Sequence, residues 1–135
     1  MKQFDIKHSI LIVDDEKAIC DGLSRLLSND YIIYQAHTGR EAIEILRNNE
    51  DIDLILCDII MPEMDGAEMI ERIRSENKEI SIIVITACTS PEQFFRIIKN
   101  GINACLMKPV DIENLEQTIR DVLQYKNIQL EILTA

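Results

Sequence analysis

Five polar residues stand at the ends of short apolar runs in this sequence, where a buried strand would be expected to finish. They are Asp14 and Asp15 after "SILIV", Asp58 after "DLILC", Thr86 at the end of "SIIVIT" and Lys108 after "ACLM". Three carboxylates brought close together repel one another unless a cation joins them, and their hard oxygen atoms suit Mg²⁺. The ammonium and hydroxyl groups would then be donors for an incoming anion. If the fold gathers these side chains, they predict a site that receives a phosphoryl group on Asp58.

The elements that must position these residues follow from an alternation along the chain. Short β-rich runs occupy residues 9–13, 31–36, 53–57, 81–86 and 104–107, and each is followed by a segment with the apolar spacing of a helix. "TGRE" and "DGAE" place a capping residue three positions before a glutamate, and "SPEQ" adds a proline at a first helical position. This alternation predicts an α/β fold, a doubly wound parallel sheet with helices on both faces. Ligands of such sheets bind outside the carboxyl ends of the strands, where the polar residues stand.

Length, composition and charge exclude several classes of protein. The chain has 135 residues, 47% hydrophobic and 28% charged, which fits one globular domain. Its net charge of −10 argues against direct nucleic-acid binding, which needs a basic surface. Its apolar runs are too short to span a membrane, and "MKQFDIKHS" has no apolar core of a signal peptide. We therefore expect a cytoplasmic protein whose widely spaced cysteines are reduced and buried, rather than zinc ligands or disulfides.

A set of short motifs resembles those of one known family. "VDDE", "CDIIMPEMDG", "TA" and "KP" have the order and spacing found in the receiver domain of two-component response regulators, and the resemblance covers roughly residues 8–124. Any one of these motifs alone would be weak, but together they are specific. The resemblance implies a flavodoxin-like receiver fold, with a five-stranded parallel sheet in the order 2-1-3-4-5 and five helices. Residues 1–124 would be the receiver domain, and residues 125–135 would extend the fifth helix or begin a linker to an output domain.

The resemblance also assigns roles to the residues at the strand ends. Asp58 is similar to the phosphoacceptor of the family. Asp15, Asp58 and the backbone carbonyl of Ile60 would hold Mg²⁺, and Asp14 would act mostly through metal-bound water. Lys108 would contact the phosphoryl group. These roles agree with the physical chemistry of phosphoryl transfer, in which positioning and charge neutralisation supply most of the rate.

Other positions would carry the response to phosphorylation. Thr86 would bind a phosphoryl oxygen and report phosphorylation, Ala87 is small enough to leave the site open, and Pro109 would follow a cis peptide bond. The position three residues before Lys108 usually holds an aromatic residue in the family, but here it is Cys105. We therefore expect the signal to pass through the fourth helix rather than through an aromatic ring.

Two positions bear on the lifetime of the phosphoryl group. In the family, the residues at Ile60 and Cys88 flank the path of the hydrolytic water, and neither has a strong hydrogen-bonding group here. Slow dephosphorylation is the expectation. Ile60 also argues against a phosphatase of the haloacid-dehalogenase type, which would place a second aspartate there. His8 and His37 lie away from the motifs and are expected to be incidental surface residues.

The resemblance implies a signalling switch that is activated by phosphorylation. Its only catalytic activities would be its own phosphorylation and dephosphorylation, so we do not expect an enzyme. Its partners would be a histidine kinase or a phosphotransfer protein, with no membrane and no nucleic acid bound by this chain. The face made by the fourth helix, the fifth strand and the fifth helix would be the output or homodimer surface, with Phe94 and Phe95 on its helix. A degenerate receiver that acts only as a protein-interaction module is the alternative.

Overall fold

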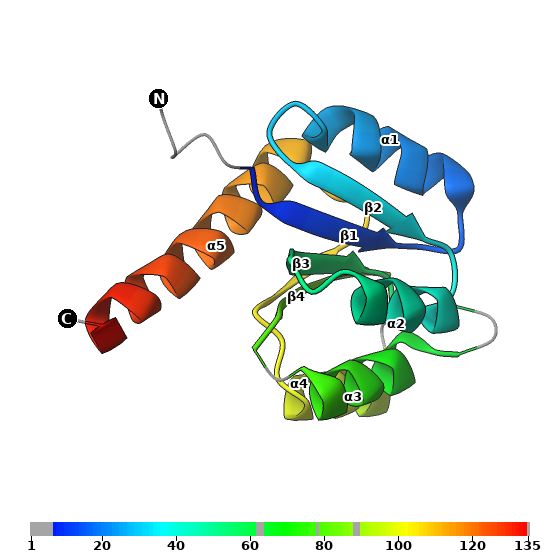
Figure 1. Ribbon diagram of the computed structural model, residues 1–135. Coiled ribbons are helices and arrows are strands. Elements are labelled where there is room, and N and C mark those ends of the chain that lie inside the picture. Colours follow the sequence, from blue (N-terminus) through cyan, green and yellow to red (C-terminus); the bar gives the residue numbers. More distant parts are fainter. Residues whose placement is uncertain (1–6, 62–63, 78, 88–89, 135) are drawn as a thin grey trace.

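The computed structural model describes residues 7–61, 64–77, 79–87 and 90–134, with side chains described as far as residue 125. Strands and helices alternate throughout this part of the chain (Figure 1). In order they are β1 Ser9–Val13, α1 Lys17–Leu27, β2 Ile32–Ala36, α2 Gly39–Asn48, β3 Ile52–Cys57, α3 Gly66–Glu76, β4 Ser81–Thr86, α4 Pro91–Lys99, β5 Ala104–Met107 and α5 Ile112–Thr134. The strands agree with those predicted from the sequence to within one residue at each end.

The strands form one five-stranded parallel sheet in the order β2-β1-β3-β4-β5, which confirms the predicted doubly wound α/β fold. The carboxyl ends of β1 and β3 lie level, because Val13 pairs with Cys57. Cys57 pairs in turn with Val84, and Val84 with Cys105, so that these three residues form one row across β3, β4 and β5. This register brings the residues that follow the strands to one edge of the sheet.

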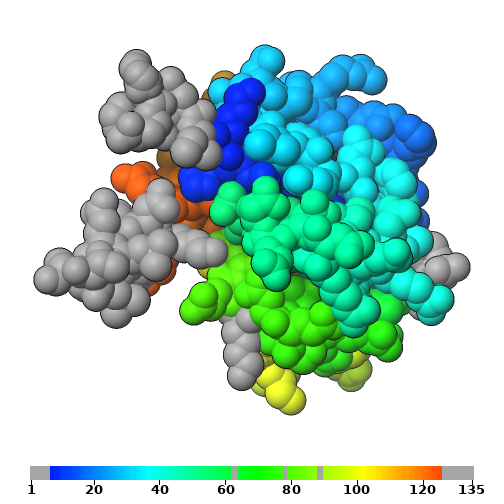
Figure 2. Space-filling view, viewed as in Figure 1, coloured from blue at the N-terminus to red at the C-terminus, as the bar shows by residue number. Residues whose placement is uncertain are grey.

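Helices cover both faces of the sheet, as strands made almost entirely of apolar residues require. Side chains alternate along each strand, so that Leu11 and Val13 of β1 face one buried cluster and Ile10 and Ile12 face the other. Helices α2, α3 and α4 pack on the first cluster, and α1 and α5 on the second (Figure 1). Figure 2 shows α2 and α3 side by side over their face. Burying one large aliphatic side chain contributes about 1.5–3 kcal/mol, so these clusters hold the strand ends firmly in place.

Three helices begin at the capping residues that the sequence predicts. The side-chain oxygen of Thr38 accepts a hydrogen bond from the backbone N–H of Glu41 at 3.0 Å, before α2. A carboxylate oxygen of Asp65 accepts from the N–H of Glu68 at 2.7 Å, before α3. Ser90 caps α4 in the same way and is followed by a proline. Because each cap fixes the point where the chain enters a helix, it also fixes the length of the loop at the carboxyl edge.

The last helix, α5, is the longest element and runs unbroken from Ile112 to Thr134. Its carboxyl-terminal part extends beyond the body of the sheet (Figure 1). None of the helices in the described part of the chain has both the length and the apolar character needed to cross a membrane.

Candidate functional site

Asp14 and Asp58 lie side by side at the carboxyl edge of the sheet because β1 and β3 end level. The backbone N–H of Asp58 donates to the carbonyl oxygen of Val13 at 3.0 Å, which continues the strand pairing to the first residue beyond β3. Asp14 and Asp58 are buried, with exposures of 4% and 7%, whereas Asp15 is exposed. One oxygen from each of these three carboxylates lies within 4.8 Å of the other two. The site therefore combines two shielded carboxylates with one that faces solvent.

This carboxylate cluster fits a hard divalent cation. Burial raises the pKa of Asp14, against the backbone hydrogen bond from Glu16 and the charge of Lys108, which lower it, while the charge of Asp58 adds to the rise. Burial thus disfavours the ionised form of Asp14, and a cation beside this carboxylate would offset that cost. Oxygen ligands with a solvent-facing side suit Mg²⁺, which keeps several of its waters when bound to protein. Asp14, Asp15 and Asp58 are the carboxylates available to such an ion, either directly or through its bound water.

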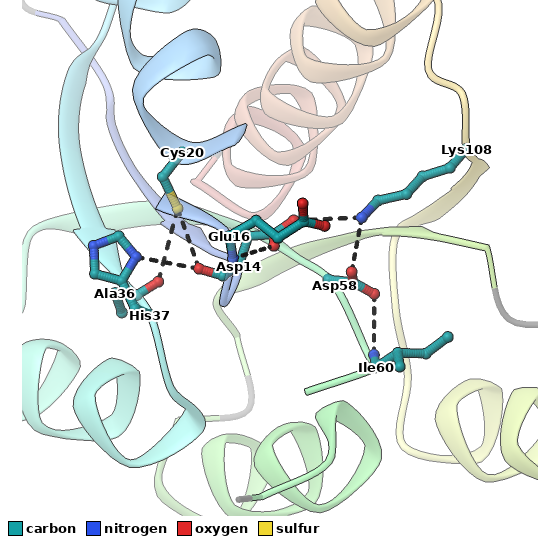
Figure 3. Close-up of polar contacts among 8 residues, drawn as sticks. All are labelled: Asp14, Glu16, Cys20, Ala36, His37, Asp58, Ile60 and Lys108. Carbon is teal, nitrogen blue, oxygen red and sulfur yellow. Dashed lines mark hydrogen bonds and ion pairs between the residues drawn. The ribbon is translucent and has the colours of Figure 1, made fainter. Parts of the chain in front are cut away.

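Lys108 contacts two of the same carboxylates. Its Nζ donates to Oδ2 of Asp58 at 2.8 Å and to Oδ2 of Asp14 at 3.4 Å (Figure 3). Desolvation lowers the pKa of Lys108, but the hydrogen bond to Asp58 and the charges of both aspartates outweigh it, so the pKa is raised. The backbone N–H of Lys108 donates to the carbonyl oxygen of Thr86 at 3.0 Å, and the Lys108–Pro109 peptide bond is cis, as the resemblance implied. These contacts hold a charged ammonium group against the two buried carboxylates.

The segment after Asp58 is held by two backbone contacts. Oδ1 of Asp58 accepts a hydrogen bond from the N–H of Ile60 at 3.0 Å, while the Ile60 side chain is 52% exposed. The N–H of Gly66 donates to the carbonyl oxygen of Ile59 at 2.8 Å. A Cβ at Gly66 would lie only 2.2 Å from the Cα of Ile59, so only glycine fits this position. The glycine of "MDG" therefore allows the start of α3 to press directly on the segment next to Asp58.

The predicted response residues lie on β4 and β5. Thr86 is completely buried at the end of β4, and Ala87 beyond it is exposed. Cys105 is half-buried on β5 and packs against the cluster under α2, α3 and α4. Burial raises the pKa of Cys57, in the same cross-strand row, to about 12. Cys88, expected beside the water path, lies outside the described residues.

Two residues that sequence reasoning missed contact the site. Nδ1 of His37 lies 3.2 Å from the carbonyl oxygen of Asp14, and Sγ of Cys20 donates to the same oxygen at 3.4 Å (Figure 3). The expectation that His37 is an incidental surface residue is therefore wrong. The strand order could have predicted this contact. Strand β2 lies next to β1 and Ala36 pairs with Val13, so the residues that follow these two strands are neighbours.

Comparison with known proteins identifies the class that this fold and site define. The family model of the response regulator receiver domain matches residues 10–120. The chain therefore belongs to the response regulator receiver domain family, as its motifs indicated.

Individual relatives agree with this assignment. The chain is 37% identical over 120 residues to the transcriptional regulatory protein ZraR of Escherichia coli O157:H7, an alignment that covers 88% of this chain and 27% of the relative. It is 33% identical over 121 residues to the response regulator MprA of Mycobacterium ulcerans (strain Agy99), covering 89% of this chain and 52% of the relative. A response regulator receiver domain protein (CheY-like) from Methanospirillum hungatei JF-1 has a TM-score of 0.88 at 30% sequence identity, over 92% of this chain and 99% of that one. The chain thus spans from about a quarter to about half of the length of these two sequence relatives.

Proposed function

We propose that this receiver domain is a phosphorylation-activated signalling switch that accepts a phosphoryl group on Asp58 with the help of Mg²⁺. The observation that carries the proposal is the contact of Lys108 with Asp58 and Asp14 inside a cluster of three carboxylates. An anionic donor can approach an anionic nucleophile only where positive charge neutralises both. An ammonium group and a cation-binding cluster around one buried carboxylate meet that need.

The roles of the individual residues follow from their contacts. Asp58 is the nucleophile, and its two oxygens are oriented by the N–H of Ile60 and by Lys108. Asp15, Asp58 and the backbone carbonyl of Ile60 would hold Mg²⁺, with Asp14 acting through bound water, and the ion would neutralise the phosphoryl oxygens. Little covalent chemistry is asked of the protein, because phosphoryl transfer depends mainly on positioning and charge. The domain takes part in its own phosphorylation and dephosphorylation and acts on no other substrate.

The switch follows from what Lys108 must do when Asp58 is phosphorylated. Before phosphorylation its ammonium group is bonded to Asp58 itself. Afterwards the phosphoryl oxygens offer new acceptors to Lys108 and to the hydroxyl of Thr86, at the ends of β5 and β4. A phosphoryl group shifts a two-state equilibrium only by the difference between its interactions in the two states. These new contacts supply that difference, and a coupling of about 1–3 kcal/mol is usual.

The face formed by α4, β5 and α5 is the output surface of this proposal. Phe95, Ile98 and Met107 are exposed by 70%, 49% and 55%, an apolar surface that a partner or a second copy of the chain would cover. Cys105 replaces the usual aromatic residue, so α4 carries the signal from Thr86. The phosphoryl donor is a histidine kinase or a phosphotransfer protein, with both partners in the cytoplasm. The names of the ZraR relatives support an output that regulates transcription, through a part of the whole protein other than this acidic domain.

Intact-mass spectrometry with acetyl phosphate and Mg²⁺ tests the proposal. The wild-type domain should gain one phosphoryl group, and Asp58→Asn should gain none while its circular dichroism is unchanged. Asp51→Asn, an exposed aspartate just before β3, is the matched control and should be phosphorylated like the wild type. Equal phosphorylation of Asp58→Asn would refute the assignment. A wild-type domain that takes up no phosphate from any donor would instead support a module that only binds partners.

A further inference from the structure

We infer that an apolar groove beside Asp58 binds the acyl chain of a small acyl phosphate. The domain would then take its phosphoryl group faster from donors with an apolar acyl chain than from acetyl phosphate. This inference rests on the proposed function, because it concerns a small-molecule donor to Asp58 that acts in addition to the protein donor.

The groove is a cavity of about 510 Å³ between α1 and the connection from β5 to α5. This volume lies within the usual range of small-ligand sites, about 300–1,000 Å³. Its apolar lining includes Ile12, Leu56 and Ile85 near the strand ends, Ile19 and Leu23 on α1, and Pro109 and Val110 in the connection. The three strand residues among them are at most 6% exposed and belong to the core under α1 and α5. The groove is therefore built on the rigid sheet and exists before any ligand binds.

The charged groups of the groove lie together at the candidate site. Among the described residues that line it, Asp14, Asp58 and Lys108 carry the only charges. A phosphoryl group next to Asp58 would pair with Lys108 and with the bound cation of the proposed function. The rest of the same molecule would meet only apolar side chains. A charged or hydroxyl-rich group would lose its hydration there without gaining hydrogen-bond partners. A short hydrocarbon chain is therefore the part of a ligand that complements this groove.

The transfer step is balanced for an acyl phosphate. A carboxylate oxygen of Asp58 forms a bond to phosphorus as the bond between phosphorus and the acyl oxygen breaks. The acyl group leaves as a carboxylate with the electron pair of that bond, and no proton is transferred. Acetate, propanoate and butanoate are equally good leaving groups, because a methylene group further along the chain hardly changes the basicity of the carboxylate. Any preference among their acyl phosphates therefore reports binding of the chain rather than intrinsic reactivity.

The size of the expected preference follows from burial of methylene groups. Full burial of one methylene group favours binding roughly fourfold, and partial burial somewhat less. Butanoyl phosphate has two methylene groups more than acetyl phosphate. We therefore expect kcat/KM for phosphorylation of Asp58 to be roughly tenfold higher with butanoyl phosphate, and to level off once the chain fills the groove.

The test measures phosphorylation rates by intact-mass spectrometry with acetyl, propanoyl, butanoyl and hexanoyl phosphate at fixed Mg²⁺. Ile19→Phe and Val110→Phe fill the groove from its two sides, and both positions are half-buried, so a larger side chain can be accommodated. In each variant the ratio of the butanoyl rate to the acetyl rate should fall close to one. Leu26→Phe is the control on α1, since Leu26 is 48% exposed and does not line the groove. It should keep the wild-type ratio.

Two outcomes of the rate measurements would overturn the inference. One is a wild-type phosphorylation rate that does not increase with the length of the acyl chain. This measurement uses the wild-type domain alone, so it does not depend on whether a variant folds. The other is a chain-length preference that survives unchanged in both Ile19→Phe and Val110→Phe. Either result would leave the proposed function intact, because acetyl phosphate would still phosphorylate Asp58. Failure of every donor, acetyl phosphate included, would refute the proposed function itself. Isothermal titration of Asp58→Asn with butanoyl and acetyl phosphate supplies the same comparison as binding constants, and equal constants would also refute the inference.

Discussion

The ring of His37 contacts the backbone of Asp14, with Nδ1 of the imidazole 3.2 Å from the carbonyl oxygen. The same oxygen accepts a hydrogen bond from Sγ of Cys20, and the N–H of Asp14 donates to the carbonyl oxygen of Ala36 at 3.1 Å. Because a carbonyl oxygen only accepts, the imidazole makes this contact with a proton on Nδ1. The backbone that carries Asp14 and Asp15 is thus anchored by two neighbouring elements, β2 and α1.

We expect His37→Ala to weaken Mg²⁺ binding roughly two- to tenfold, the range that corresponds to one net hydrogen bond. The loss would come from greater freedom of the two aspartates that the anchored backbone presents. Isothermal titration with Mg²⁺ measures it. His8→Ala is the matched control, because His8 pairs with Asp53 at 3.3 Å near the amino ends of β1 and β3. A similar loss of affinity in both variants would show that the effect is not specific to the site.

Gly66→Ala should destabilise the domain by about 1–3 kcal/mol, the usual cost of forcing extra atoms into a packed region. The added Cβ would overlap the backbone of Ile59, which a side-chain rotation cannot relieve. Phosphorylation of Asp58 should also slow, because the displaced segment carries the N–H of Ile60. Urea unfolding measures the free energy change. Gly22→Ala in the middle of α1, with no atom near its added Cβ, should instead stabilise by about 1 kcal/mol. Equal effects of the two substitutions would contradict the steric explanation.

The raised pKa of Asp14 determines the sign of a pH effect on stability. Its folded-state pKa lies above the unfolded value near 3.8, so the native state binds this proton more tightly. The stability that this group contributes therefore falls as pH rises from the unfolded pKa through the folded pKa, and stays low above it. Urea unfolding without Mg²⁺ from pH about 4 to about 7 should show this component, and Asp14→Asn should lack it. An identical pH profile for the variant would assign the titration to another group.

Millimolar Mg²⁺ should raise the melting temperature of the domain, because a ligand bound only by the native state stabilises it by mass action. Asp15→Ala should remove most of this rise, since Asp15 is the exposed member of the cluster and its loss disturbs no buried contact. Differential scanning calorimetry with and without the ion gives the comparison. Asp30→Ala, an exposed aspartate between α1 and β2, should respond to Mg²⁺ like the wild type. If Asp15→Ala keeps the full response, the ion binds elsewhere.

Ile60→Asn should speed the loss of the phosphoryl group from Asp58. Positioning of an attacking water is typically worth ~10²–10⁴-fold, and an amide near the acceptor should recover roughly tenfold of this. Because Ile60 is 52% exposed, the substitution should leave the fold stable. The decay of phosphorylated protein followed by intact mass measures the rate. Ile98→Asn, 49% exposed on α4, should have no effect on the decay. An unchanged half-life in Ile60→Asn would rule out this position as a determinant of lifetime.

Local patterns were enough to predict the fold and most of the candidate site. Asp58 and Lys108 each follow an apolar run directly, so their positions at strand ends could be inferred without knowing which strands are neighbours. Once the sheet is parallel, all such ends lie at one edge. The capping residues Thr38 and Asp65 could also be predicted from the sequence, because a capping residue and its partner are only three residues apart.

The missed features depend on contacts between elements far apart in the sequence. His37 meets Asp14 only because β2 lies next to β1 with Ala36 opposite Val13, a register that no local pattern specifies. The steric need for Gly66 depends on how closely α3 approaches the segment after β3. The groove likewise requires the spacing between α1 and the residues beyond β5. The roles of these residues therefore depend on the spacing between elements, and no local sequence pattern indicates them.

The row formed by Cys57, Val84 and Cys105 has a consequence for the behaviour of the domain under oxidation. With Val84 between them, the two cysteines are two strand spacings apart, so their Cα atoms are separated by roughly 9–10 Å. A disulfide cannot bridge more than about 7 Å between Cα atoms without moving the backbone. The sheet that it would have to distort is the same sheet that aligns Asp14 with Asp58. These two thiols therefore cannot lock the domain in one state, and its response to phosphorylation should be insensitive to the redox poise of its surroundings at this pair.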